Sequence, residues 1–104
     1  MMELARIIDH LVCVAANALD MGAMTCFWLL FRWREEVYTM VESACGMRLT
    51  TTYARIGGMS YDLPEDFMPR LAKFCEEFPK ALDEVVGLLN ANRIWIDRMK
   101  GVGK

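Results

Sequence analysis

Hydrophobic residues recur at helical spacing over the first part of the chain. Between Glu3 and Met21 they follow one another at steps of three or four: Leu4, Ile7, Ile8, Leu11, Val14, Ala15 and Ala18. This spacing predicts a long amphipathic helix. A second stripe, of polar residues, runs down its other face through Arg6, His10, Cys13, Asn17 and Asp20. Such a stripe is typical of a solvated helix face, or of a buried polar track where another chain covers it.

A second helix is predicted from Cys26 to Cys45, with Thr25 as its N-cap. One side of it is apolar, through Phe27, Leu30, Phe31, Val37, Val41 and Ala44. Gly46 stands where a left-handed residue ends a helix. Arg32 and Glu36 lie one turn apart, and we expect them to pair on the exposed side.

The segment from residue 48 to residue 61 changes character, because it is rich in Thr and Tyr and alternates in part. It predicts a short β-hairpin or extended loop, with Gly57-Gly58 as a two-residue turn. Asp62 and Glu65 then form the pattern of a capping box, with Pro64 in the first turn of a third helix. The buried side of that helix is predicted at Phe67, Leu71, Phe74 and Phe78.

Pro79 cannot continue a helix interior, so we expect it to start a fourth helix. Leu82, Val85, Val86 and Leu89 would face inward there, and Asn90 or Asn92 would end it. A short fifth helix would carry Trp95, Ile96 and Met99. The fold class is therefore all-α: a small bundle of four to five helices with one hairpin or extended loop at about residues 48–61.

With 104 residues, the chain has room for a single domain, residues 1–104, with a modest core. Hydrophobic residues make up 55% of it, so we expect apolar surface to be left over. The formal net charge of −2 is made of mixed signs, which argues against a nucleic-acid partner. The run from Leu11 to Phe31 is long enough to span a membrane, but Asp20 at its middle makes insertion costly. Two helices buried in a larger assembly are the preferred interpretation.

Candidate chemistry is sparse. The four cysteines, Cys13, Cys26, Cys45 and Cys75, form no C-x-x-C pair, so no metal site is expected, and buried reduced thiols in a cytoplasmic protein are the preferred interpretation. The lone His10 has no nucleophile motif around it, and Gly57-Gly58 is not followed by the Lys and Ser/Thr of a phosphate loop. We therefore assign no catalytic residue.

Three motifs are more informative: Thr52-Tyr53-Ala54-Arg55-Ile56-Gly57-Gly58, Asp62-Leu63-Pro64, and the run from Asn92 to Gly103. Together with residues 18–23 and 32–36 they resemble the D subunit of bacterial NADH:quinone oxidoreductase, the hydrogenase-large-subunit-like part of respiratory complex I. The resemblance covers nearly the whole chain but only about a quarter of the family's subunit. We therefore expect an internal excerpt of that subunit, and do not take Met1 as necessarily native.

The resemblance implies a place in the quinone-reducing module, next to a smaller subunit that carries the terminal iron–sulfur cluster. By this resemblance, Leu19, Gly22, Ala23, Met24 and Thr25 help to wall the quinone cavity. The alternative for Gly22 and Ala23 is that they merely let two helices approach closely. The resemblance implies that this chain itself binds no cofactor. Quinone, NADH, FMN and iron–sulfur clusters are implied for the parent complex.

Two further sets of residues take roles from the resemblance. Arg55 matches the arginine of the family's Tyr-x-Arg-x-Gly-Gly motif and would face the cluster-bearing partner or act on the cluster electrostatically; the alternative is an arginine that satisfies a buried loop. Arg6, His10 and Asp20 match polar residues of the family's first helix and would relay protons, or else form a structural polar cluster. Asn92, Arg93 and Trp95 are interpreted as a helix start whose arginine and tryptophan anchor to neighbours.

The implied partners are the remainder of the D subunit, the small subunit, other complex I subunits and quinone. The implied location is the peripheral arm on the cytoplasmic side of the inner membrane, without a transmembrane segment. A fragment of the large subunit of a membrane-bound hydrogenase, and a free-standing helical interaction module, remain as alternatives. Alone, the chain is expected to be inactive and to form a homo-oligomer that hides Phe27, Trp28, Leu30 and Phe31, with the first or second helix exchanged between copies.

Overall fold

The computed structural model describes residues 1–103, which form four helices and one two-stranded hairpin. In chain order these elements are α1 (Met2–Asp20), α2 (Met24–Cys45), β1 (Ala54–Arg55), β2 (Gly58–Met59), α3 (Phe67–Ala91) and α4 (Arg93–Met99). The predicted all-α class with one hairpin is confirmed.

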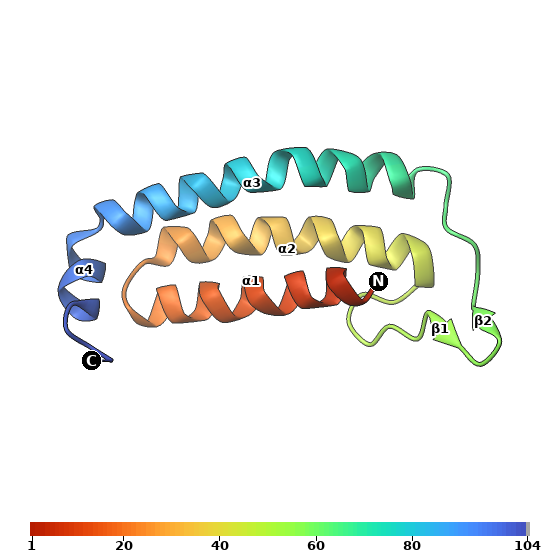
Figure 1. Cartoon of the computed structure of the whole chain (residues 1–104), viewed down its shortest axis with the longest axis horizontal. Helices are drawn as coiled ribbons and strands as arrows, with labels where there is room; N and C mark the ends of the chain where they lie inside the picture. Colours follow the sequence, from red (N-terminus) through yellow and green to blue (C-terminus); the bar gives the residue numbers. More distant parts are fainter. Residues whose placement is uncertain (104) are drawn as a thin grey trace.

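The three long helices lie side by side and antiparallel, with α2 in the middle (Figure 1). They give the molecule an elongated shape of 52 × 25 × 20 Å. The short α4 folds back at the end where α1 turns into α2, and the hairpin lies at the opposite end, near the N-terminus (Figure 1). The two candidate regions of the sequence, the α1–α2 turn and the Arg55 hairpin, are therefore at opposite ends of the molecule.

The core consists of two clusters arranged along α2. One contains Leu4, Val37, Met40, Val41, Ala44, Tyr53, Phe67 and Phe74, and the other contains Leu11, Ala15, Ala18, Ala23, Cys26, Leu30 and Val85. Both clusters combine side chains of α1, α2 and α3, which is why α2 is the central helix. Tyr53 belongs to the first cluster and fixes the loop that precedes the hairpin. Val14, which the periodicity places inward, is 49% exposed.

Two predicted helix starts are wrong. Thr25 caps nothing, because α2 already begins at Met24. The reversal between α1 and α2 takes only three residues, with Gly22 at a φ of +91°. The capping box of Asp62 and Glu65 does not form either, since α3 starts at Phe67 with Asp66 as its N-cap residue.

Residues 64–67 form a turn instead, in which the Phe67 backbone N–H donates to the Pro64 carbonyl at 3.0 Å. This turn brings Phe67 into the core, where it is 4% exposed. Gly46 ends α2 with a φ of +73°, in agreement with the sequence prediction.

Pro79 does not start a helix, because α3 runs without interruption from Phe67 to Ala91 with this proline inside it. The third and fourth predicted helices are thus one. A proline removes one backbone hydrogen bond, but side chains on both sides of it hold the helix against α2. Phe74 and Phe78 stack at 4.8 Å before it, and Val85 is buried after it.

The hairpin turn and one predicted ion pair also differ from expectation. Ala54 pairs with Met59 and Arg55 with Gly58, so the turn residues are Ile56 and Gly57 rather than the two glycines. Gly57 takes a φ of +92° at the second turn position, where a type II turn needs glycine. Arg32 and Glu36 form no ion pair among residues 1–103.

The run from Leu11 to Phe31 is divided between two helices by the turn at residues 21–23. Within the part of the chain that the structure describes, no helix has both the length and the apolar character needed to cross a bilayer.

Candidate functional site

The residues predicted to wall a cavity lie at the end of the molecule where α1 turns into α2. Ala23 is buried there in the second core cluster, at 5% exposure. Leu19 and Met24 are exposed at 37% and 60%, and Thr25 is exposed as well. The structure therefore brings the five residues together, and all of them except Ala23 are exposed.

The helix α4 covers this turn from one side. A Cβ atom on Gly22 would lie 3.7 Å from Cγ2 of Ile94. The Arg98 guanidinium donates from Nη1 to the Asp20 carbonyl at 3.2 Å. Trp95 packs against the second core cluster. The last part of the chain is thus attached to the end of α1 by one hydrogen bond and a few apolar contacts.

Asn92 starts α4, as its position in the motif predicts. Its Oδ1 accepts hydrogen bonds from the backbone N–H groups of Ile94 at 3.0 Å and Trp95 at 3.3 Å. Within residues 1–103 the Arg93 side chain is 93% exposed and its ion pair is with Asp97, at 3.6 Å, so its anchoring to neighbours stays a prediction. Arg98 provides an anchoring contact within this chain, and its place in the last turn of a short helix gave no signal of this in the sequence.

Large apolar side chains are exposed at this end, beside charged residues such as Asp20 and Arg93. Trp28 is 65% exposed one turn after Met24, and Ile94 is 56% exposed on α4. Leu30, by contrast, is buried at 2%, and Phe27 and Phe31 are half-buried and stack at 4.1 Å. Trp28 is therefore the one mostly exposed residue among the four that a homo-oligomer was expected to bury, Phe27, Trp28, Leu30 and Phe31.

The polar stripe of α1 is exposed along its whole length. Arg6 pairs with Glu3 at 3.0 Å. Asn17 donates to the Cys13 carbonyl at 2.8 Å, so these two central members bond within their own helix. Arg6, His10 and Asp20 share one face, and within this chain that face is open.

Arg55 lies on the hairpin, next to the turn, and its side chain is exposed. Within residues 1–103 it has no hydrogen-bond or ion-pair partner. It therefore does not satisfy a buried loop in this chain. Ser60 provides hydrogen bonds to the loop instead, since its hydroxyl donates to the backbone carbonyls of Thr52 and Tyr53 at 3.1 and 3.2 Å.

Arg34 and Arg48 flank the ring of Tyr38, an arrangement that the sequence analysis missed. The Arg34 guanidinium lies 4.6 Å from the Tyr38 ring centre, and that of Arg48 lies 5.4 Å from it. Arg34 also donates to the Tyr38 hydroxyl. Arg48 pairs with Glu42 at 2.8 Å and with Glu35, and these hydrogen bonds raise the pKa of the Arg48 guanidinium. The spacing of four residues between Arg34 and Tyr38 on α2 could have indicated their contact. No such spacing indicates the contact of Arg48, which lies in the loop after α2.

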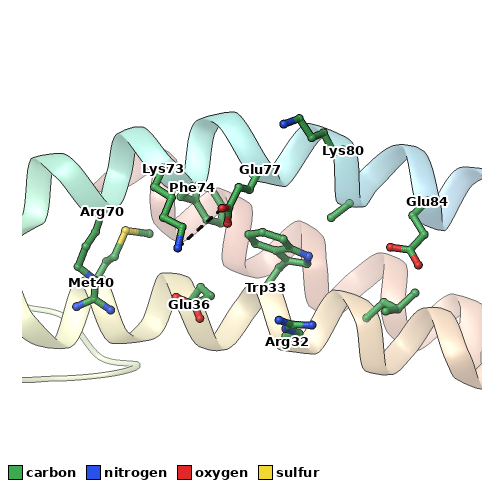
Figure 2. A pocket seen from close by; sticks show the side chains of 12 residues that line it. Arg32, Trp33, Glu36, Met40, Arg70, Lys73, Phe74, Glu77, Lys80 and Glu84 are labelled. Carbon is green, nitrogen blue, oxygen red and sulfur yellow. Dashed lines mark ion pairs between the residues drawn. The ribbon is translucent and has the colours of Figure 1, made fainter.

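A groove of about 490 Å³ runs between α2 and α3 (Figure 2). Its floor is apolar and includes Leu29, Trp33, Met40, Phe74 and Ala81. Trp33 lies 5.8 Å from the rings of both Phe74 and Phe78. Its rim carries charges of both signs: Arg32, Glu36, Arg70, Lys73, Glu77, Lys80 and Glu84.

The cysteines are free thiols, but only Cys26 is buried; Cys13 and Cys75 are exposed and Cys45 is intermediate. The prediction of buried thiols is therefore wrong for Cys13 and Cys75, which lie on outward faces of α1 and α3. Burial raises the pKa of the Cys26 thiol above its ordinary value of 9.0. Among the described residues, no cluster of His, Cys, Asp or Glu side chains is arranged to hold a metal ion.

Comparison with known proteins decides the family. The sequence pattern of the family described as "Respiratory-chain NADH dehydrogenase, 49 Kd subunit" matches residues 20–104. The chain belongs to this family. Its relatives include the D subunit of the NADH-quinone oxidoreductase of Campylobacter curvus, which is 50% identical over 103 residues, and that of Magnetococcus marinus, 47% identical over 102 residues. A D subunit of the Chloroflexus aurantiacus NADH-quinone oxidoreductase, numbered 2, is 46% identical over 101 residues.

The matched region is nearly the whole chain but a small part of each relative. It covers 99% of this chain against 25% of the Campylobacter curvus protein, and 98% against 26% of the Magnetococcus marinus protein. The chain thus spans about a quarter of the length of the relatives it matches. The resemblance drawn from the motifs is confirmed, including its extent.

Proposed function

We propose that the chain serves in the quinone-reducing module of an NADH:quinone oxidoreductase, where its α1–α2 end helps to wall the quinone cavity. NADH oxidation, FMN and the iron–sulfur clusters belong to other parts of that complex, and the isolated chain has no such activity. The complex would place it in the peripheral arm, on the cytoplasmic side of the inner membrane. The observation that carries the proposal is the alignment with D-subunit relatives along 99% of the chain.

The α1–α2 end supports the proposal through its chemistry. Met24 and Trp28 present apolar surface to the outside, and Ile94 of α4 does so beside Gly22. A quinone ring is flat and apolar and is best held by walls of this kind, with few polar groups to fix its orientation. The cavity itself would be completed by the cluster-bearing subunit and by the remaining length of the D subunit.

Arg55 supports a role toward a partner, since it is an exposed cation beside the hairpin turn with no hydrogen-bond or ion-pair partner in the described chain. A guanidinium stays protonated and offers five donors, which suits it to hold carbonyls or carboxylates of a neighbouring subunit. Its charge would also act on a nearby cluster. The relay assigned to Arg6, His10 and Asp20 needs a covering subunit, because within this chain that stripe is solvated.

The cavity wall is tested with a matched pair of methionines in the intact complex. Met24 and Met68 are both 60% exposed, Met24 at the α1–α2 end and Met68 in the first turn of α3. Met24→Trp should raise the KM for a short-chain quinone several-fold and leave electron transfer to an acceptor upstream of quinone unchanged. Met68→Trp should leave both unchanged. Equal KM values for the two variants would remove the α1–α2 end from the cavity wall.

The role of Arg55 is tested against Arg93, which is equally charged and 93% exposed. Arg55→Ala should reduce quinone reduction or the level of assembled complex, whereas Arg93→Ala should change neither. Arg34, a charged residue of α2, is an unsuitable control because its guanidinium packs on the Phe31 and Tyr38 rings. Equal rates and equal complex levels for the Arg55 and Arg93 variants would contradict the role given to Arg55.

A further inference from the structure

We propose that Arg48 is a positioning residue for Arg55, because its attachment to α2 sets the place at which the hairpin presents the Arg55 guanidinium. This role rests on the role toward a partner subunit that is proposed above for Arg55. The contacts that carry it all lie between residues of the described chain.

Three side chains of α2 form the attachment site for Arg48. Glu35, Tyr38 and Glu42 follow one another at steps of three and four residues, so they lie along one face of the helix with the tyrosine ring in the middle. The backbones of the two glutamates are about 10.5 Å apart along the helix axis. A single guanidinium can therefore reach both carboxylates only from a position between them.

Arg48 occupies this position, coming from the loop after α2. Its Nη1 donates to Glu42 at 2.8 Å, and its Nη2 donates to Glu35. Its guanidinium carbon lies 5.4 Å from the centre of the Tyr38 ring. The ring is fixed in turn, because Tyr38 is 6% exposed and its hydroxyl accepts from Arg34. The planar fork of an arginine defines direction as well as distance, so these contacts define the path of the chain as it leaves α2.

The other end of this loop is attached with less directionality. Tyr53 is 6% exposed in the first core cluster, but its hydroxyl has no hydrogen-bond partner within residues 1–103. Apolar packing is non-directional, so it buries the ring without fixing the orientation of the backbone. Residues 49–52, between the two attachments, are exposed. Arg48 therefore supplies the charged and directional attachment of the loop.

The position of Arg55 follows from these two attachments. Arg55 lies two residues after Tyr53. Ser60 closes the base of the hairpin, since its backbone N–H and its hydroxyl donate to the Tyr53 carbonyl at 3.0 and 3.2 Å. The strands β1 and β2 pair with each other and contact no helix of the described chain. A shift of residues 48–53 is therefore passed on to Arg55.

The network is better suited to fixing geometry than to stabilising the fold. The side chains of Arg48, Glu35 and Glu42 are 43%, 61% and 47% exposed. Ion pairs that are this exposed contribute little to global stability. The left-handed Gly46 already ends α2 before Arg48 is reached. Removal of the Arg48 charge should therefore leave the helices folded and change the path of the loop.

A double-mutant cycle in the intact complex tests this role. The readouts are the rate of quinone reduction and the level of assembled complex. Arg48→Gln should lower the readout that Arg55→Ala lowers, by at least about twofold. The double variant should lose no more than Arg55→Ala alone, because a residue that acts through Arg55 then has nothing left to position. Losses that multiply in the double variant would show that Arg48 acts independently, and would overturn the proposal.

Lys73→Gln is the matched control, because it also removes a cation from an exposed ion pair, the one with Glu77 at 3.8 Å on α3. It should leave both readouts unchanged. Hydrogen exchange of this chain within the complex gives a local readout. In Arg48→Gln the amides of residues 47–60 should exchange faster, while those of α2 stay protected. Loss of protection throughout α2 would assign Arg48 to the stability of that helix and would overturn the positioning role.

The roles of Arg55 and Arg48 fail in different ways. If Arg55→Ala changes neither readout, the role proposed for Arg55 is wrong, and the role of Arg48 is wrong with it. If Arg55→Ala lowers a readout but Arg48→Gln behaves like Lys73→Gln, Arg55 keeps its role. In that case the rest of the longer protein holds the hairpin in place, and the positioning role of Arg48 is wrong.

Discussion

The carboxamide of Asn92 is the contact whose removal tests the α1–α2 end most directly. Its Oδ1 accepts from two backbone N–H groups at the start of α4, at 3.0 and 3.3 Å. The helix has only seven residues and none of them is buried. A helix this short is not stable by itself, so its cap and its few contacts decide whether it stays closed over the turn.

Replacing Asn92 with alanine should cost about 1 kcal/mol, the typical value for loss of an N-cap side chain. This corresponds to roughly a fivefold rise in the population of open α4. Because α4 buries no residue completely, the three-helix core should remain folded, and the global melting temperature should fall by no more than about 4–8 °C. Asn92→Asp keeps an acceptor at the cap and should behave like the parent chain.

Hydrogen exchange of the α4 amides is the measurement, with quenching of Trp95 fluorescence as a second readout. Asn90→Ala is the matched control, because Asn90 is exposed in the last turn of α3 and its side chain makes no hydrogen bond within the described residues. Exchange in α4 should accelerate about fivefold in the Asn92 variant and stay unchanged in the control. Unchanged exchange in the Asn92 variant, or equal acceleration in both, would refute the reasoning.

The core and the thiols give three more predictions. Val37→Ala, at a residue with 0% exposure, should cost about 2 kcal/mol by chemical denaturation, while Val86→Ala, at 52% exposure, should be near neutral; equal losses would contradict the core assignment. Iodoacetamide should modify the exposed Cys75 before the buried Cys26. Burial raises the pKa of the Cys26 thiol in the folded chain. The contribution of this thiol to the free energy of unfolding is therefore complete below its unfolded pKa, and it is lost as the pH rises through its folded pKa. Purified chain should show no flavin or iron–sulfur absorbance; a stoichiometric band would contradict the proposed division of cofactors.

Residue spacing predicted the helices well where periodicity extends over many turns. Most of the apolar positions of α1 and α2, though not Val14, and Gly46 as the end of α2 were predicted, because burial repeats every three or four residues and a left-handed position favours glycine. The local sequence signals for helix starts were misleading where tertiary contacts determine the first residue of a helix. Asp62 has the pattern of a cap, but the burial of Phe67 moves the start of α3 to that residue.

The prediction that Pro79 starts a new helix was wrong for the same reason, because tertiary contacts override the local signal. A proline is a strong local signal, yet the contacts of Phe74, Phe78 and Val85 with α2 keep α3 continuous through it. Contacts between residues far apart in the chain, such as that of Arg98 with the Asp20 carbonyl, leave no periodic trace at all. The groove between α2 and α3 is also a product of such packing, because residues of both helices line it.

The small residues of the α1–α2 turn, Gly22 and Ala23, have different structural explanations. A Cβ on Gly22 would meet Ile94 at 3.7 Å and Arg98 at 3.8 Å, which are ordinary contact distances, so space alone does not demand glycine. The φ of +91° does demand it, because side chains rarely tolerate that conformation. Ala23 is different: at 5% exposure it is a core residue, and its size is set by the close packing of α1 and α2. Within this chain the backbone conformation accounts for Gly22 and the core packing for Ala23, so the proposed quinone wall at this end depends on the exposed apolar side chains of Met24, Trp28 and Ile94.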